Sequence, residues 1–192
     1  MVIGISGKIG SGKDAFADLF IEHMRTAHGL EFKNKKFAYN LKKMVSTLTG
    51  VPIEDVFSRE GKLKYLPDWN LTIGEIQQLL GTEAVRNNIH NNAWVLSLFG
   101  TYDEDEDFWI VTDVRFKNEA EIIKEKGGII VRLEGDPNNS RTGDDRNMMH
   151  QSEIDLDDYE GFDYIHENSP PIENLKTFVK EIAEKIIKNT LG

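Results

Sequence analysis

Residues 2 to 15 read Val2-Ile3-Gly4-Ile5-Ser6-Gly7-Lys8-Ile9-Gly10-Ser11-Gly12-Lys13-Asp14-Ala15, and they determine the type of fold. The first five residues form a short apolar run next to a glycine, which predicts a buried parallel strand. After the glycine-rich turn, apolar residues recur at helical spacing to about residue 25, at Phe16, Leu19, Phe20 and Met24. A strand, a tight turn and a helix in this order are typical of an α/β sheet.

The rest of the chain continues this alternation. Further strands are predicted at residues 36–39, 108–112, 129–133 and 162–166. Helices are predicted at 41–48, 52–57, 118–126, from Thr72 (with Glu75 completing a capping box), from Val85 towards Phe99, and after Ser169. Residues 58–70 are polar and irregular, and we expect a mobile loop there. Alternating strands and helices imply a central parallel sheet with right-handed crossovers.

The glycine-rich turn carries the clearest chemistry. Glycines allow successive backbone N–H groups to converge on phosphate oxygens, and the helix N-terminus adds partial positive charge. Lys13 would reach the β- and γ-phosphates of a nucleotide such as ATP. The motif usually ends in Ser or Thr, which ligates Mg²⁺, whereas this chain has Asp14. That carboxylate would bind Mg²⁺ directly or through a water, or would simply cap the helix.

Composition limits the remaining choices. The chain has 192 residues, 39% of them hydrophobic, which suits one domain spanning residues 1–192. Apolar stretches such as residues 93–99 and 108–111 are far shorter than the roughly 20 residues of a membrane span. No basic segment precedes the first strand, so no signal peptide is expected. Cysteine is absent, which excludes disulfides and thiolate zinc sites. A cytoplasmic enzyme is the interpretation that fits best.

Charge argues against nucleic-acid binding. The formal net charge is -10, whereas affinity for a phosphate backbone requires many cations. A nucleotide enzyme with this charge must concentrate positive groups locally. None of the five histidines shows the spacing of zinc ligands. The acidic residues 103–107 repel one another, and we expect them to form a solvated loop or hairpin tip.

A second anion site is predicted after the strand at residues 108–112. Asp113 ends that strand, where ligands bind in open α/β sheets, and Arg115 follows. The arginine can grip a phosphate with two parallel N–H bonds, and Asp113 can hold Mg²⁺. Alternatively, Asp113 caps the turn and Arg115 pairs with Glu119.

Residues 134–158 form a long polar segment that carries Arg141 and Arg146. In phosphoryl transfer, a mobile arginine-bearing lid can close over the phosphates and stabilise transition-state charge. The alternative is a solvated surface loop whose arginines have no such role. We therefore treat Lys13, Asp14, Arg115, Arg141 and Arg146 as candidate catalytic residues.

These motifs together resemble a known family. The Gly12-Lys13-Asp14 ending, residues 78–83 (Gln-Leu-Leu-Gly-Thr-Glu), the Asp-Val-Arg sequence at 113–115 and residues 150–153 (His-Gln-Ser-Glu) occur in the order found in bacteriophage deoxynucleoside monophosphate kinases. The resemblance spans nearly the whole chain. It implies a three-layer P-loop kinase fold with a central parallel sheet, a helical monophosphate-binding insertion at about 40–100, and a mobile lid at about 134–158. It also implies a role in deoxynucleotide biosynthesis in the host cytoplasm, and work as a homodimer.

The resemblance assigns residues to two substrates. Gly10, Gly12, Lys13, Asp14 and Ala15 would bind ATP and Mg²⁺. The loop motif itself adds Gly7, Lys8, Ile9 and Ser11 as ATP-binding residues, and the predicted metal ligands are Asp14 and Asp113. The acceptor would be bound by Leu41, Lys42, Gln78, Gly81, Thr82, Arg86, Trp94, Asp113, Arg115 and Glu119. Neither nucleic acid nor a membrane is an expected partner. The functional alternatives are a phosphomevalonate kinase, a dephospho-coenzyme A kinase, and a switch that binds ATP without transferring phosphate.

Overall fold

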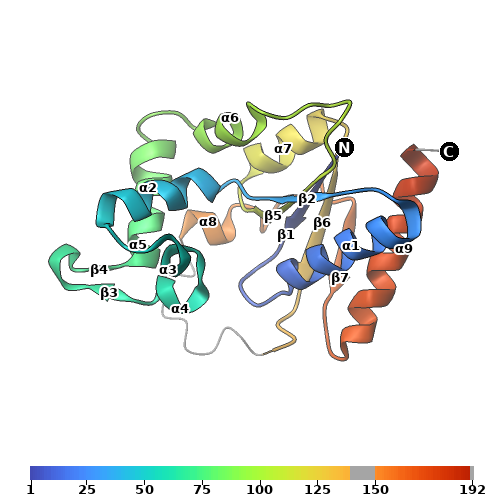
Figure 1. Cartoon of the computed structure of the whole chain (residues 1–192), viewed down its shortest axis with the longest axis horizontal. Helices are drawn as coiled ribbons and strands as arrows, with labels where there is room; N and C mark the ends of the chain where they lie inside the picture. Colours follow the sequence, from blue (N-terminus) through green and yellow to red (C-terminus); the bar gives the residue numbers. More distant parts are fainter. Residues whose placement is uncertain (139–149, 191–192) are drawn as a thin grey trace. The chain divides into compact units, whose positions relative to one another are not determined.

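The computed structural model describes residues 1–138 and 150–190, which fall into two compact units (Figure 1). The first unit comprises Met1–Lys35, Asp103–Asp145 and Asp155–Gly192, and we call it the sheet unit. The second comprises Lys36–Tyr102 and Arg146–Ile154, and we call it the helical unit. The helical unit is inserted into the sheet unit along the chain, and each unit is described by itself below.

The sheet unit is built on five parallel strands in the order β2-β5-β1-β6-β7. Their bounds are Val2–Ser6 (β1), Lys33–Lys35 (β2), Trp109–Val114 (β5), Ile129–Glu134 (β6) and Tyr164–Glu167 (β7). The central strand β1 is buried along its whole length, as expected for a parallel strand covered on both faces. The predicted α/β class with a central parallel sheet is confirmed.

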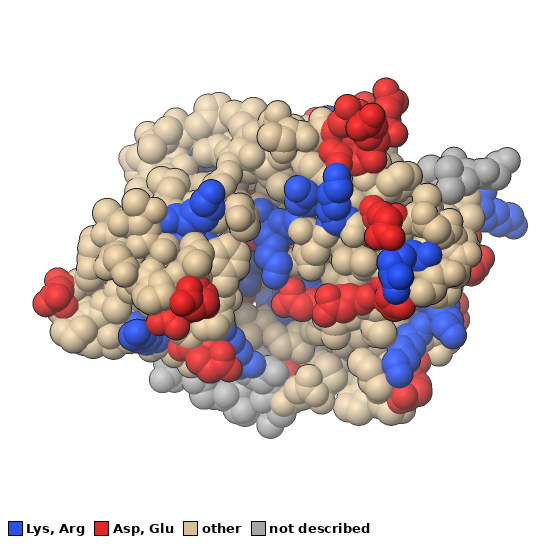
Figure 2. All heavy atoms as spheres, in the orientation of Figure 1, with Lys and Arg blue, Asp and Glu red and all other residues tan. Residues whose placement is uncertain are grey.

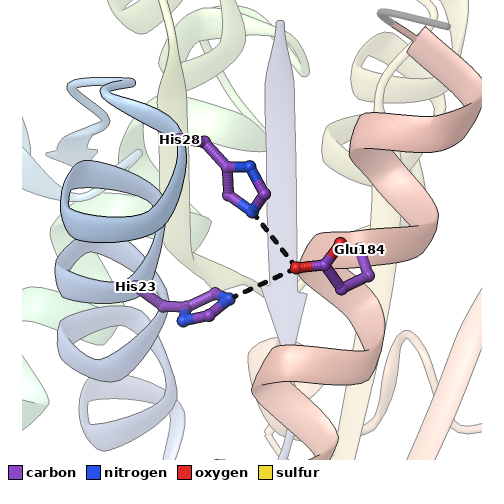
Figure 3. A group of neighbouring side chains, drawn as sticks. All are labelled: His23, His28 and Glu184. Carbon is purple, nitrogen blue, oxygen red and sulfur yellow. Dashed lines mark ion pairs between the residues drawn. The ribbon is translucent and has the colours of Figure 1, made fainter.

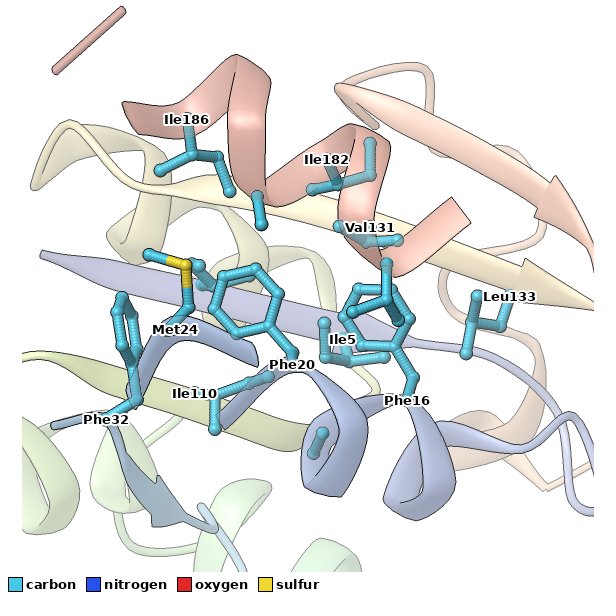
Figure 4. Close-up of a cluster of buried hydrophobic side chains, with 14 of the residues drawn as sticks. Ile5, Phe16, Phe20, Met24, Phe32, Ile110, Val131, Leu133, Ile182 and Ile186 are labelled. Atoms are coloured by element: carbon cyan, nitrogen blue, oxygen red, sulfur yellow. The ribbon is translucent and has the colours of Figure 1, made fainter. Parts of the chain in front are cut away.

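Helices cover both faces of this sheet. Helices α1 (Lys13–His28) and α9 (Ile172–Thr190) pack on one face, where Phe16 and Phe20 enter the core (Figure 4). Helix α7 (Lys117–Glu125) packs on the other face, close to Gly4. A Cβ placed on Gly4 would meet Ile123 of this helix and Ile130 of β6. Side chains alternate along β1, so the residues next to Gly4 face α1 and α9 instead. The result is a three-layer arrangement.

The helical unit contains short elements. Its α-helices are Tyr39–Thr49 (α2), Ile53–Phe57 (α3), Arg59–Lys62 (α4), Ile73–Gln78 (α5), Ala93–Phe99 (α6) and Gln151–Ile154 (α8). A π-helical segment, η2 (Leu79–Arg86), continues α5. The capping box predicted for α5 is present: the Thr72 hydroxyl accepts from Glu75 N–H, and the Glu75 carboxylate accepts from Thr72 N–H.

Three predictions of secondary structure between residues 36 and 99 were wrong. The second strand lies at 33–35, and residue 39 already begins α2. Residues 58–70 form ordered elements, namely α4, the strand β3 (Tyr65–Leu66) and a 3-10 turn η1 (Pro67–Trp69), and β3 pairs with β4 (Leu71–Thr72). Ser58 caps α4, and Asn70 adopts the left-handed conformation that closes the hairpin. The helix expected from Val85 to Phe99 is interrupted between η2 and α6.

The surface of the sheet unit carries a concentrated acidic segment before β5 (Figure 2). Residues 103–106 are exposed, as predicted, but Asp107 is buried. Its carboxylate accepts from Asp103 N–H at 3.0 Å and from Lys33 Nζ at 2.9 Å. The last residue of the acidic run therefore closes the turn. Among the helices of the described residues, none is long and apolar enough to cross a bilayer.

Candidate functional site

The candidate site lies where β1 and β5 end side by side in the sheet unit. Ser6, the last residue of β1, is in register with Val114, the last residue of β5. Neighbouring strands are about 4.8 Å apart, so the segments that leave these two strands start close together. The first is the glycine-rich loop, and the second begins with Arg115. Carboxyl ends of parallel strands are where open α/β sheets bind ligands.

Two glycines explain the tight path of the loop. A Cβ on Gly7 would lie 2.3 Å from Ser11 Oγ and 2.4 Å from the Leu133 carbonyl oxygen. Gly12 precedes α1 with φ 91°, a left-handed conformation, and a Cβ there would lie 2.4 Å from Asn168 Nδ2. Larger residues do not fit at either position without moving backbone or a buried amide. The loop backbone is therefore closely packed against Leu133 and Asn168.

Lys13 and the start of α1 give the loop its positive character. The Lys13 ammonium donates to the carbonyl oxygens of Gly7 and Lys8 at 2.7 and 2.8 Å, so it lies along the loop. Ser11 Oγ is buried and has no hydrogen-bond partner among the described residues. Asp14 is exposed in the first turn of α1. A glycine cradle, an ammonium group and a helix N-terminus fit a phosphate chain.

Asn168 supports this loop and was not predicted from the sequence. It follows β7, it is 4% exposed, and its Nδ2 donates to the Ser11 carbonyl oxygen at 2.9 Å. Its backbone N–H donates to the Glu134 carbonyl oxygen at 3.1 Å. The amide thus holds the loop from behind through one buried hydrogen bond. The only indication in the sequence is its place just after a strand.

Asp157 also holds the loop, together with Arg132 of β6. Lys8 Nζ lies 2.6 Å from the Asp157 carboxylate. Arg132 is buried, donates to Ser6 Oγ at 3.0 Å and reaches Asp157 at 3.5 Å. The carboxylate therefore joins the loop lysine to an arginine of β6, the strand next to β1. Asp157 lies in the segment predicted to form the lid. Its contact with Lys8 joins residues that are far apart in the chain, so the sequence did not predict it.

Glu119 fixes the backbone of the second predicted anion site. It is buried in the first turn of α7, and its Oε2 accepts from Arg115 N–H at 2.9 Å and Phe116 N–H at 3.2 Å. Lys117 N–H donates to Asp155 at 2.8 Å. Arg115 therefore starts a segment whose backbone amides are held by two carboxylates. In this arrangement Glu119 positions the arginine through its backbone.

The predicted acceptor residues of the helical unit cluster around η2. Trp94 is buried, and its indole N–H donates to the Gly81 carbonyl oxygen at 2.9 Å. A Cβ on Gly81 would lie 2.6 Å from Leu41 Cδ2, so the glycine allows α2 to approach. Thr82 is buried beside it in the same element, and Gln78 ends α5. π-helical segments frequently occur at functional sites.

Within the described part of the helical unit, two cations are buried. Lys42 is 7% exposed, and its ammonium lies 4.5 Å from the centre of the Phe57 ring. Arg86 is 4% exposed and donates to the Asn91 carbonyl oxygen at 3.0 Å. Charged side chains are rarely buried so deeply. They are two buried positive charges in a protein whose net charge is -10.

His150 links the described end of the lid segment to η2 within the helical unit. Its Nε2 lies 2.9 Å from Glu83 Oε1, and its Nδ1 lies 2.8 Å from Ser152 Oγ. Arg141 and Arg146 lie outside the described residues.

The predicted site residues thus divide between the units. The sheet unit holds the loop from Gly7 to Ala15 with Asp113, Arg115 and Glu119, and the helical unit holds Leu41, Lys42, Gln78, Gly81, Thr82, Arg86 and Trp94.

The matching family model and two viral relatives agree on one family. A family model described as deoxynucleotide monophosphate kinase matches residues 31–179. A putative deoxynucleotide monophosphate kinase of Acanthamoeba polyphaga mimivirus is 28% identical over 188 residues, covering 90% of this chain and 91% of that protein. A deoxynucleoside-5'-monophosphate kinase of Escherichia phage T5 is 24% identical over 180 residues, covering 65% and 72%. Among solved structures, a dephospho-CoA kinase from Campylobacter jejuni aligns over 98% of both chains with 17% identity and a TM-score of 0.47.

Proposed function

The chain belongs to the deoxynucleotide monophosphate kinase family, and we propose that it transfers the γ-phosphoryl group of MgATP to a deoxynucleoside monophosphate. The family match over residues 31–179 carries this conclusion. The glycine-rich loop precedes that range and supports nucleotide use independently. Family membership also favours this activity over the phosphomevalonate kinase, dephospho-coenzyme A kinase and switch alternatives.

The loop is suited to the phosphates of ATP. Backbone N–H groups from Gly10 to Lys13 would bind the β-phosphate, with the N-terminus of α1 behind them. Lys13 would turn from the carbonyl oxygens of Gly7 and Lys8 towards the β- and γ-phosphates. The Lys13 side chain is already held at the loop, so it loses little conformational freedom when it binds the phosphates.

Two carboxylates fit a magnesium ion. Asp14 is exposed beside the loop, and Asp113 lies at the end of β5, next to β1. Oxygen ligands, few in number and supplemented by water and phosphate, are what Mg²⁺ prefers in nucleotide sites. A bound Mg²⁺ would supply positive charge that offsets the negative charge of the phosphates. We propose Asp14 and Asp113 as its protein ligands.

The acceptor site needs cations, because a monophosphate must approach the polyanionic ATP. Arg115 follows β5, and Glu119 holds the backbone N–H at the residue from which this side chain extends. Lys42 and Arg86 are buried cations among the described residues of the helical unit. We propose that these three residues neutralise the acceptor phosphate, and that Gln78 and Trp94 contact its base.

The reaction itself requires little covalent chemistry from the protein. An oxygen of the acceptor phosphate attacks the γ-phosphorus, a new P–O bond forms, and the bond to the β-phosphate oxygen breaks with its electron pair leaving on ADP. The phosphate oxygen is already ionised, so no general base is needed. Catalysis therefore consists of positioning and charge neutralisation. The predicted lid arginines Arg141 and Arg146 would add positive charge in the transition state.

Two variants test the assignment with purified protein. Lys13→Ala should lower kcat by about 10²-fold or more, because a cation at the transferred phosphate is lost. Arg115→Ala should raise KM for the deoxynucleoside monophosphate while KM for ATP changes little. The exposed Arg25, which pairs with Glu22 on the outer surface of α1, supplies the control Arg25→Ala. Wild-type turnover in Lys13→Ala, or an Arg115→Ala effect confined to ATP, would refute the assigned roles.

Two further predictions come from the resemblance. The first is that the chain forms a homodimer, and analytical ultracentrifugation of the purified chain should then give twice the mass of one chain. Action in the host cytoplasm is tested by fractionation of infected cells.

A further inference from the structure

Three side chains that the proposed reaction does not use converge between α1 and α9 in the sheet unit. His23 and His28 point from α1 towards Glu184 of α9 (Figure 3). The Nε2 atom of His28 lies 3.4 Å from Glu184 Oε1, and that of His23 lies 3.9 Å from the same oxygen. All three atoms lie within 4.8 Å of one another.

One nitrogen of each histidine ring is buried and has no hydrogen-bond partner among the described residues. The Nε2 atoms of His23 and His28 have almost no solvent exposure, and neither makes a hydrogen bond to the described residues. Their distances to Glu184 exceed the usual range of a hydrogen bond. A buried polar atom without a partner costs free energy, so such atoms usually mark a missing water, ion or ligand. Here two of them face one carboxylate oxygen.

The spacing is close to that of a metal site, which small side-chain movements would complete. Zinc bonds of about 2.0–2.2 Å place tetrahedral ligands roughly 3.3–3.5 Å apart. The His28–Glu184 distance of 3.4 Å already matches. The His23–Glu184 distance of 3.9 Å requires a small rotation of the ring or of Glu184, which is 64% exposed and free to adjust.

We propose that His23, His28 and Glu184 bind a divalent cation of the zinc class, with solvent as the remaining ligand. Two imidazole nitrogens and one carboxylate are ligands for Zn²⁺, Ni²⁺ or Cu²⁺, whereas Mg²⁺ and Ca²⁺ require oxygen ligands. The exposed side of Glu184 leaves room for water to complete the coordination.

This site is separate from the magnesium site proposed at the phosphate loop. The loop lies at the N-terminus of α1, whereas His28 is its last residue. A rise of 1.5 Å per residue puts the ends of α1 roughly 22 Å apart. The C-terminus of a helix also favours a cation, because the helix dipole is negative there.

The site would be structural. It joins two helices that are distant in the chain and that form one face of the core, so a cation bound to all three side chains would stabilise their packing by mass action. The spacing of His23 and His28 alone does not indicate zinc. A metal site was therefore not predicted from the sequence. Glu184 completes the set only after α9 packs on α1.

Isothermal titration of the metal-stripped full chain with Zn²⁺, in excess Mg²⁺, tests the proposal. Excess Mg²⁺ occupies the oxygen-ligand sites near the phosphate loop. We expect one site that is lost, or weakened by at least about tenfold, in both His28→Ala and Glu184→Gln. His90→Ala, which removes an exposed histidine of the helical unit, should retain it. Zn²⁺ should raise the Tm of the wild type and of His90→Ala only.

Glu184→Gln keeps an exposed side chain of the same shape, so its folding is not in question. Both site variants should keep wild-type kcat for phosphoryl transfer, since they lie outside the proposed active site. With Co²⁺ in place of Zn²⁺, the wild type should show visible absorption bands that the two variants lack. Absence of saturable Zn²⁺ binding, or equal binding by wild type and Glu184→Gln, would overturn the proposal and leave only a histidine–glutamate ion pair.

Discussion

Replacing Asn168 with alanine would remove a buried side-chain hydrogen bond that holds the phosphate loop at Ser11. The amide Nδ2 donates to the Ser11 carbonyl oxygen at 2.9 Å, and Asn168 is only 4% exposed. The variant leaves a buried carbonyl oxygen without this donor, at a cost of about 1–3 kcal/mol in free energy of unfolding. At roughly 2–4 °C per kcal/mol for a chain of this size, the Tm should fall by several degrees.

The same change should affect ATP more than the acceptor. Gly12 and Ser11 lose their support on the side facing away from the ligand, so the loop must be ordered when ATP binds. If about half of the lost free energy is expressed in binding, KM for ATP rises by about twofold to twelvefold, because 1.4 kcal/mol corresponds to a factor of ten. KM for the monophosphate should change by less than twofold.

Two further variants isolate the hydrogen bond. Asn168→Asp keeps the shape but replaces the donor with a carboxylate, which repels both the Ser11 carbonyl and the ATP phosphates, so KM for ATP should rise further. Asn174→Ala is the matched control, because Asn174 is exposed and its amide makes only 3.4 Å contacts. Thermal unfolding and steady-state kinetics are the assays. Wild-type Tm and wild-type KM for ATP in Asn168→Ala would refute this account of the loop.

Other predictions concern charge and positioning. The N–H of Asp103 and the ammonium of Lys33 lower the pKa of Asp107 from 3.8 to about 2. Its stabilising contribution is therefore complete above about pH 4 and is lost as the pH falls towards 2. Urea unfolding over this range should show a weaker pH dependence for Asp107→Asn; an unchanged profile would contradict the prediction. Glu119→Ala should raise KM for the monophosphate by about tenfold and lower the Tm, because Arg115 N–H and Phe116 N–H lose their acceptor. An unchanged KM would show that Arg115 is positioned by other contacts.

The sequence predicted the sheet well where apolar residues were continuous. β1, β5 and β6 are buried strands, and their composition makes them recognisable. The edge strand β2 consists of Lys-Asn-Lys, which has neither apolar alternation nor β-branched residues. It is a strand because it pairs with β5, and that pairing is a tertiary effect. The strand was predicted at 36–39 instead, because that stretch contains the apolar Phe37.

The candidate site was predictable where a local motif carried it. The glycines and Lys13 are adjacent in sequence, so their chemistry is visible without a structure. Asn168 and Asp157 reach the loop from the other end of the chain, and no spacing rule connects them with Ser11 or Lys8. The same applies to the histidines of α1, which meet Glu184 only in the folded sheet unit.

The most direct test of the proposed function is the identity of the acceptor. The purified chain would be incubated with MgATP and, separately, with each deoxynucleoside monophosphate, phosphomevalonate and dephospho-coenzyme A, and ADP release would be measured. Phosphorus NMR would identify the second product. We predict ADP and a deoxynucleoside diphosphate in equal amounts with at least one deoxynucleoside monophosphate, and no acceptor-dependent turnover in Lys13→Ala. Turnover with only phosphomevalonate or dephospho-coenzyme A, or ATP binding without transfer to any acceptor, would contradict the account.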